Sequence, residues 1–436
     1  MDLPQPPIAD LDPQRINPHD FGAVGDGESD DRVALQHCLD AASAVNGTVV
    51  LTKSYALHST LNARSNSHLR FVGGARLIRR FGGRALLSNE RFEDKITNFQ
   101  MTGDGVIDGK EIPGQTLFLF GDDLVLSGFT ITNFAGGQAI LIGGDRNRVR
   151  EVTTTNPEKA PGTGGIRMFG GHDFLARGCN VTSGDDAFQF TPIATPDHPL
   201  RDLSIDTAQY VDCSGRSEVA RLAVVILSTS PPGAGGMTAS ITGVAFQKCS
   251  GSAGRRGIVV ANTDSTGTIS DVTFSECEID LSAAESGEGY QEILVQRSPG
   301  AGPVRTLRFK GVAIISPRST AFGTRGDAEA DAFVEDIHLE NCLLNAPADG
   351  NSTVKLLGVR DCRISGGRIE GRGAKPTISG GVGPNAAEDL HIDGVALPGV
   401  ADITQAVRLP ATKSLRVVNC GLGTGGTSAK CARPSA

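Results

Sequence analysis

The sequence predicts an all-β fold: a single-stranded right-handed parallel β-helix, a solenoid of about 13 coils with an N-terminal capping α-helix. A frame of alternating apolar residues recurs 13 times between residues 74 and 420, about every 29 residues. Clusters of Gly, Asn, Asp and Ser separate the copies, and glycine is abundant at 56 of 436 residues. A repeat of about 20–50 residues indicates a solenoid, and apolar alternation with a period of two indicates strands. Each coil is therefore expected to pack on its two neighbours.

The repeated frame ends in cysteine in seven of its copies. These residues are Cys179, Cys213, Cys249, Cys277, Cys342, Cys362 and Cys420. Because equivalent positions of successive coils stack on one another, we expect one buried internal column of thiols. A metal or redox site would call for closely spaced or exposed ligands, and the nine cysteines include no CxxC and no Cys/His pair at metal spacing.

The chain begins with an N-terminal extension over residues 1–19, and a capping helix is predicted over residues 30–44. Ser29 or Asp30 can serve as its N-cap. Asn46-Gly47 ends it, and Thr48 begins the first strand. We expect the helix to close the first coil with four apolar residues at helical spacing, Leu35, Cys38, Leu39 and Ala42.

No linker divides the rest of the chain, so one β-helix domain is predicted over residues 20–420, the helix included. The Gly-, Ser- and Thr-rich residues 421–436 are predicted to form a flexible C-terminal tail.

Charge and hydropathy exclude two classes of partner. The chain has 41 Lys and Arg against 49 Asp and Glu and no long basic run, so we expect no nucleic-acid partner. Its longest apolar stretches are too short for a membrane helix, so no membrane partner is expected. The first twenty residues lack the features of a signal peptide. The chain as given is thus predicted to be cytoplasmic, or else secreted or periplasmic if a leader has been removed.

The entry segment Asp20–Asp31, DFGAVGDGESDD, followed by the predicted helix, resembles the opening of pectin-lyase-like β-helix proteins. This superfamily includes polygalacturonases, alginate epimerases and many phage depolymerases. The acids of the segment could hold Ca²⁺, which makes calcium a possible cofactor, or they could cap the helix. Helix capping is the simpler explanation.

The stretch Val181–Phe190, VTSGDDAFQF, is similar to the Gly-Asp-Asp strand of polygalacturonases. The resemblance implies that Asp185 and Asp186 activate water and protonate the leaving group, roles that require one ionised and one protonated carboxyl. Three other motifs of that family are missing. Gly164 stands where its third catalytic Asp belongs, Ala220–Val224 replaces its Gly-His-Gly, and Gly257–Ala261 replaces its basic motif.

Strand alternation predicts the substrate-binding face without reference to the family. Arg167 is expected to point outward beside Gln189, with an apolar extension of the groove toward Val259. Arg221 and Arg256 lie at strand entrances, where guanidinium groups suit carboxylate or sulfate.

His172 follows a Gly-Gly turn and is a candidate titrating group. The alternatives are that the arginines neutralise nearby acids and that His172 is a solvated turn residue.

These features favour a carbohydrate-active enzyme that cleaves or modifies an acidic, uronate-containing polysaccharide or oligosaccharide, with hydrolysis through paired aspartates. A uronate lyase or C5-epimerase is an alternative. The absence of tryptophan and the missing motifs leave two others open, an enzyme that acts on a small-molecule metabolite in a shortened apolar groove and a catalytically inactive binding solenoid.

Overall fold

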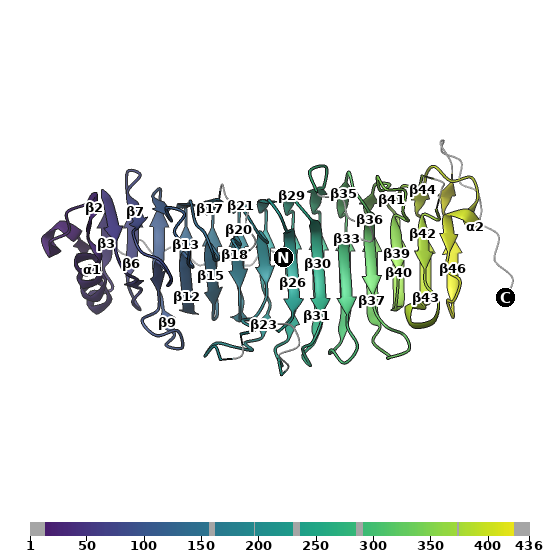
Figure 1. Cartoon of the computed structure of the whole chain (residues 1–436), viewed down its shortest axis with the longest axis horizontal. Helices are drawn as coiled ribbons and strands as arrows, with labels where there is room; N and C mark the ends of the chain where they lie inside the picture. Colours follow the sequence, from purple (N-terminus) through teal and green to yellow (C-terminus); the bar gives the residue numbers. More distant parts are fainter. Residues whose placement is uncertain are drawn as a thin grey trace.

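The computed structural model describes residues 14–156, 162–195, 197–229, 236–284, 291–372 and 375–422. Within them, three long parallel sheets run side by side along one axis, so that the chain winds as the predicted parallel β-helix (Figure 1). We name them sheets A, B and C, with 18, 15 and 14 strands. Within the described part of the chain, no helix has the length and hydropathy needed to cross a bilayer.

Sheet C carries the candidate site. Along the chain its strands are β5 (Leu61–Asn62), β8 (Leu87–Ser88), β9 (Ile96–Thr97), β12 (Leu117–Asp122), β15 (Ile140–Gly143), β18 (Ile166–Met168), β22 (Phe188–Phe190), β26 (Arg221–Leu227), β30 (Arg256–Asn262), β33 (Gln291–Arg297), β36 (Thr320–Arg325), β39 (Val354–Leu356), β42 (Ile378–Gly380) and β45 (Val407–Arg408). Strands β9 and β8 both pair with β12, and the others follow one another in order.

In its C-terminal half, sheet A has one strand in each coil. Its strands there are β31 (Ile269–Ser275), β34 (Val304–Lys310), β37 (Val334–Glu340), β40 (Val359–Ser365), β43 (Glu388–Asp393) and β46 (Leu415–Val418). Left-handed residues turn the chain from sheet A to sheet B in these coils, for example Glu276 at φ 53° and Asn341 at φ 53°. Gly, Asn and Asp favour this conformation, which explains part of the glycine excess.

The core is a set of residue columns along the axis, each filled by equivalent residues of successive coils. In one of them the rings of Tyr210, Phe246, Phe274 and Phe309 stack with centroids 5.2, 4.9 and 5.3 Å apart. The cysteine column lies beside it, at the start of the sheet B strands. Cys179, Cys213, Cys249 and Cys277 fill four successive positions and are all buried.

The expected place of Cys362 in the cysteine column is wrong. Cys362 pairs with Ile337 of β37 and Leu390 of β43, and therefore lies in sheet A. Gly367 takes the column position next to Cys342. A Cβ at Gly367 would lie 2.3 Å from the carbonyl oxygen of Cys342, so this position has no room for a side chain.

The capping helix α1 spans Arg32–Val45 and begins two residues later than predicted. Leu35, Cys38, Leu39 and Ala42 are fully buried in the core, as expected for a helix that closes the first coil. Its N-cap is Asp31, whose side chain makes no capping hydrogen bond.

Of the two predicted caps, Asp30 does accept a hydrogen bond from the N–H group of Arg32, the first residue of α1 (3.1 Å), whereas the Ser29 hydroxyl donates to Asp26. The other acids of the entry segment bind backbone groups outside the helix. Asp31 accepts hydrogen bonds from the N–H groups of Val24 (2.6 Å) and Gly25 (3.2 Å), and Asp26 accepts from Glu28 and Ser29 (2.8 Å each).

Short strands continue the sheets past the predicted domain limits. β1 (Arg15–Ile16) pairs in parallel with β3 (Thr48–Leu51), so these two residues of the N-terminal extension belong to the first coil. β47 (Gly421–Leu422) pairs with β44 (Ala396–Leu397) at the other end. Residues 1–13 and 423–436, with most of the predicted extension and tail, lie outside the described residues.

Candidate functional site

A row of polar residues lies where the chain enters sheet C. Gln138, Gly164, Asp186, Arg221 and Arg256 occupy equivalent positions in five successive coils. Backbone hydrogen bonds join these coils directly, from Ala139 N–H to Gly164 O (2.9 Å), from Gly165 N–H to Asp186 O (2.9 Å) and from Ala187 N–H to Arg221 O (3.0 Å). Arg221 and Arg256 are paired residues of β26 and β30. We name this set the polar row.

The centre of the polar row is a buried ion pair. Arg221 Nε lies 2.6 Å from Asp186 Oδ1 and Nη2 lies 2.5 Å from Oδ2, and the Arg221 backbone N–H also donates to Oδ1. Asp186 is only 5% exposed. Burial raises the pKa of Asp186, although the guanidinium opposes this shift. Burial also acts to lower the pKa of Arg221, but the Asp186 charge outweighs it and raises that pKa.

Asp185 lies beside this pair and is partly exposed. Its Oδ2 accepts a hydrogen bond from Gly162 N–H (2.6 Å) and its Oδ1 accepts one from Asp186 N–H (2.9 Å). The structure therefore places both predicted catalytic carboxylates at one turn, but each already has partners from the chain itself.

Gln189 and Gln138 brace the turn that carries Asp186. Gln189 Nε2 donates to Gln138 Oε1 (2.9 Å) and to the Asp186 carbonyl (3.0 Å). A Cβ at Gly164 would lie 2.0 Å from Gln138 Oε1 and 2.6 Å from Gln189 Nε2. This amide bridge occupies the space beside Gly164, the position where the family's third acid would stand.

Arg167 pairs with Gln189 as predicted, but its guanidinium is bound by the backbone. Its Nε donates to Thr191 O (2.8 Å) and its Nη2 to Pro192 O (2.5 Å). Burial lowers the pKa of Arg167 to about 10. Its visible role is to hold the chain that leaves β22.

Glu292 extends the site beyond Arg256. It is 1% exposed, and its Oε1 accepts hydrogen bonds from the N–H groups of Arg318 (3.0 Å) and Ser319 (3.1 Å). Among the described residues, its Oε2 has no hydrogen-bond partner. Burial raises the pKa of Glu292, while the two N–H donors and the Arg256 charge act to lower it.

Sequence reasoning did not include Gln138 and Glu292 among the site residues. Gln138 stands directly before an apolar strand, as Asp186 does, and this shared position is the signal that could have identified it. Glu292 sits inside the predicted strand next to Gln291, and only its burial distinguishes it from a surface acid.

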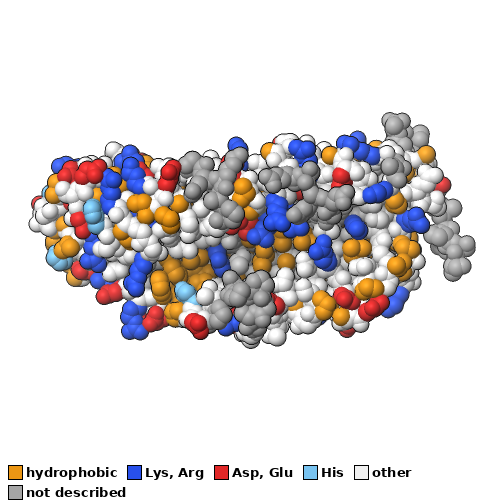
Figure 2. Space-filling model, viewed as in Figure 1, with side chains coloured by type: hydrophobic (Ala, Val, Ile, Leu, Met, Phe, Trp, Pro, Cys, Tyr) orange, Lys and Arg blue, Asp and Glu red, His pale blue; other side chains and the backbone are white. Residues whose placement is uncertain are grey.

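The outer face of sheet C is apolar on both sides of Arg167 and Gln189. On one side Val224, Val259, Ala261 and Leu294 form a cluster with 1–5% exposure, which agrees with the predicted apolar extension. On the other side Phe118 lies at the centre of a second cluster, with the rings of Phe92 and His198 stacked on it at 4.7 and 5.8 Å. Figure 2 shows apolar patches along the middle of the molecule, with Lys and Arg side chains next to them.

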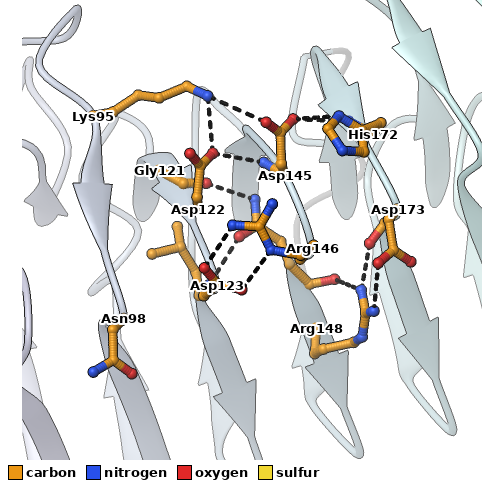
Figure 3. A network of polar contacts seen from close by, with 12 residues as sticks. Lys95, Asn98, Gly121, Asp122, Asp123, Asp145, Arg146, Arg148, His172 and Asp173 are labelled. Atoms are coloured by element: carbon orange, nitrogen blue, oxygen red, sulfur yellow. Dashed lines mark hydrogen bonds and ion pairs between the residues drawn. The ribbon is translucent and has the colours of Figure 1, made fainter. Parts of the chain in front are cut away.

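His172 is not part of the polar row. It lies in β19 (Gly171–His172) of sheet A, and its Nδ1 is 3.0 Å from Asp145 Oδ1 (Figure 3). Asp145 also lies 3.5 Å from the ammonium group of Lys95, which contacts Asp122 at 2.9 Å. His172 thus lies apart from Arg167, because the chain turns from sheet C to sheet A at the intervening glycines.

No group of three or more His, Cys, Asp or Glu side chains suited to a metal ion occurs among the residues that the structure describes. The carboxylates of the entry segment, the site suggested for Ca²⁺, accept backbone N–H groups instead.

Comparison with solved structures identifies the fold. An exopolygalacturonase of family 28 from Yersinia enterocolitica superposes with a TM-score of 0.63 at 15% identity, over 93% of this chain and 79% of that one. The chain has the fold of the pectin-lyase-like proteins. A hyperthermoactive exopolygalacturonase from Thermotoga maritima matches with a TM-score of 0.56 at 14% identity, over 96% and 93% of the two chains.

A third structure of this pectin-lyase-like fold is the tailspike of Escherichia coli bacteriophage HK620, in complex with a hexasaccharide. It matches with a TM-score of 0.55 at 12% identity, over 94% of this chain and 78% of that one. No protein-family model matches the sequence, and a search of curated protein sequences gives no match. At such identities the likeness concerns the fold, and function must be argued from the site.

Proposed function

We propose that this chain is a carbohydrate-active enzyme that binds and modifies a uronate-containing oligosaccharide or polysaccharide at the polar row of sheet C. The observation that carries the proposal is the bidentate contact between Arg221 and Asp186. A planar guanidinium that binds one carboxylate through two N–H groups can bind a substrate carboxylate in the same way. The shared fold supports the substrate class, since two of the matched proteins are exopolygalacturonases and a third binds a hexasaccharide.

Exchange of carboxylates would start the reaction. A uronate that takes the place of Asp186 on Arg221 frees the Asp186 carboxylate beside the sugar ring. Because burial raises the pKa of Asp186, the freed carboxylate is a better proton acceptor than an aspartate in water.

Two reactions fit the freed carboxylate. In hydrolysis, Asp185 and Asp186 share the activation of water and the protonation of the leaving oxygen, and the glycosidic bond breaks. In C5 chemistry, Asp186 takes the C5 proton, and the electron pair passes into the carboxylate held by Arg221. In elimination the C4–oxygen bond then breaks, and the leaving oxygen takes the proton from Asp186 and departs as an alcohol. In epimerisation water delivers a proton to the other face of C5, and Asp186 releases its proton to solvent. The contact with Arg221 favours the second reaction, which needs a cation on the uronate carboxylate.

To test the proposal, the protein is incubated with polygalacturonate and with polymannuronate. The formation of reducing ends, the ultraviolet absorbance of unsaturated products and the ratio of C5 epimers in the polymer are then measured. Hydrolysis gives reducing ends without absorbance, elimination gives both, and epimerisation changes the ratio alone. Asp186→Asn is expected to lower the rate by about a hundredfold or more. Asp280→Asn, an exposed acid on β32 (Glu278–Asp280) of sheet B, is the matched control and should leave it unchanged.

An unchanged rate in Asp186→Asn would overturn the assigned site. Absence of all three products, together with thermal stabilisation by apolar metabolites and not by uronate oligomers, would instead identify the apolar cluster around Val259 as a small-molecule site.

A further inference from the structure

The outer face of sheet A carries a second set of matched side chains, far along the chain from the polar row. Arg308, His338, Arg363, His391 and Arg416 are register partners on five consecutive strands, β34, β37, β40, β43 and β46. Adjacent strands are about 4.8 Å apart, so arginine and histidine alternate along the axis at that spacing. We name this set the Arg/His row.

A parallel row of acids lies two residues earlier on the same strands. Asp336, Asp361 and Asp389 each adopt a left-handed conformation, at φ 51°, 52° and 50°, in neighbouring coils. Donor side chains and acceptor side chains thus run side by side along the axis.

The last coils leave part of these two rows open as a groove. It has a volume of about 310 Å³ and is lined by Asp361, Arg363, Asp389, Leu390, His391, Ser414 and Arg416. Nearer the middle of the chain the rows are paired, since Arg308 contacts Asp336 at 2.7 Å. In the groove Arg363 also forms an ion pair, with Asp361 at 3.5 Å, whereas Arg416 forms none within the described part of the chain. Nε2 of His391 is buried and finds no hydrogen-bond partner in the part of the chain that the structure describes.

We infer that this groove is a second saccharide-binding site, separate from the polar row, which holds an acidic oligosaccharide along the axis of the β-helix. The carboxylate or sulfate groups of the sugar lie on the Arg/His row, where guanidinium and imidazolium groups donate hydrogen bonds. The hydroxyl groups of the sugar donate to Asp361 and Asp389. The two rows thus match the two kinds of polar group on an acidic sugar, and the acids do not repel it, because they meet hydroxyls.

His391 lies between two arginines of the groove. It faces Arg363 and Asp361 on β40, Arg416 on β46, and Asp389 and Asp393 on its own strand. An anion bound along the axis can therefore accept hydrogen bonds from this ring and from both neighbouring guanidinium groups.

His338 has similar surroundings. It faces Arg308 and Lys310 on β34, Arg363 and Asp361 on β40, and Asp336 and Glu340 on its own strand, and it lies 3.1 Å from Asp336. Burial and the Arg308 charge lower its pKa. Because an anion bound beside it on Arg363 favours the protonated ring, the complex takes up a proton at His338, and affinity rises as the pH falls from 8 to 6.

Fluorescence anisotropy with the full chain and labelled polygalacturonate oligomers at low salt tests the inference. The double variant Arg363→Gln/Arg416→Gln should weaken binding about tenfold at pH 6. The double variant Arg150→Gln/Arg177→Gln is the matched control, because these arginines are also register partners on sheet A and lie outside the groove. His338→Gln should remove the change in affinity between pH 8 and pH 6. The double variant Asp186→Leu/Arg221→Met removes both members of the buried ion pair of the polar row. It should leave the pH-dependent component of binding in place, which separates this groove from the polar row.

Four outcomes would overturn the inference. The first is that polygalacturonate oligomers do not bind at pH 6, and the second is that neutral dextran binds with the same affinity as they do. The third is that the control variant loses as much affinity as Arg363→Gln/Arg416→Gln, and the fourth is that single-stranded DNA of matched charge binds as tightly as the oligomers. The last result would indicate a general polyanion surface. A failure of the enzymatic test above leaves this site unaffected, since its readout is binding alone.

Discussion

Arg221 holds both carboxylate oxygens of Asp186, with Nε 2.6 Å from Oδ1 and Nη2 2.5 Å from Oδ2. The two residues stand 35 positions apart in the sequence and one coil apart in the structure, at the edge of sheet C. The side chain of Asp186 is 7% exposed and that of Arg221 is 28% exposed, so the contact is largely shielded from water. This contact joins two adjacent coils, and it holds the carboxylate that the proposed reaction uses.

Removal of Arg221 should strongly destabilise the protein. Arg221→Met leaves a buried aspartate without its counter-charge, which costs about 3–5 kcal/mol. The double variant Asp186→Leu/Arg221→Met should recover most of this loss, because an apolar pair leaves no charge unpaired. Urea unfolding followed by circular dichroism measures both effects. Arg146→Gln, which breaks an exposed pair with Asp123, serves as the control and should lose far less. An equal loss in the two single variants would contradict the argument.

The carboxyl of Glu292 should make stability depend on pH. Burial raises the pKa of Glu292 in the folded protein above its unfolded value, so the native state holds this proton more tightly. Its contribution to the free energy of unfolding therefore falls as the pH rises through that interval. Glu292→Gln should be more stable than the native chain at pH 8, and the difference should shrink toward pH 4. Thermal melting across this range measures it. Glu278→Gln, at an exposed position of β32, is the control. The prediction is refuted if the melting temperature of Glu292→Gln changes with pH in parallel with that of the native chain.

Gly367 should tolerate no side chain. It lies at φ 72°, and a Cβ there would lie 2.3 Å from the carbonyl oxygen of Cys342. Gly73 lies at a similar φ of 65° with nothing within 4 Å of the added atom. Gly73→Ala should cost about 1–2 kcal/mol for the left-handed backbone alone. Gly367→Ala should cost a further ~1–3 kcal/mol from overpacking, as measured by urea unfolding. Equal losses would show that the close approach is harmless.

The buried thiols should be inert in the folded protein. Burial raises the pKa of Cys342 to about 11 and that of Cys362 to about 12, and only the thiolate reacts with disulfide reagents. A Cys431→Ser variant removes the cysteine that lies outside the described residues. Its eight remaining cysteines are all buried. Titration with Ellman's reagent should detect almost no thiol in buffer and eight in guanidinium chloride. Rapid reaction of several thiols in buffer would contradict the buried column.

Much of the fold could be predicted because every coil repeats the same local pattern. Alternating apolar residues such as Phe174 and Ala176, followed by a turn residue and Cys179, define a strand, a bend and a core position without reference to other coils. The same pattern misassigned Cys362, because residues 357–362 and 362–367 both fit the frame. Pairing of Cys362 with Ile337 and Leu390 excludes the first alternative.

The candidate site shows where sequence reasoning ends. The apolar repeat predicted that Arg167 lies beside Gln189, because the two residues are equivalent positions of adjacent coils. It did not reveal that Arg221 closes on Asp186, that Gln138 bridges to Gln189 across Gly164, or that His172 belongs to a different sheet. Those contacts depend on the exact length of each turn.

The sequence by itself determined the repeat, the direction of each strand's side chains and the helix that closes the first coil, because these are short-range properties of apolar spacing and turn chemistry. Only the tertiary structure decided which charges meet. An ion pair such as Arg221–Asp186, or a row such as Arg363–His391–Arg416, joins residues some 25 to 35 positions apart. Stacking of the coils sets their register to within a residue, and a shift of one position would separate them.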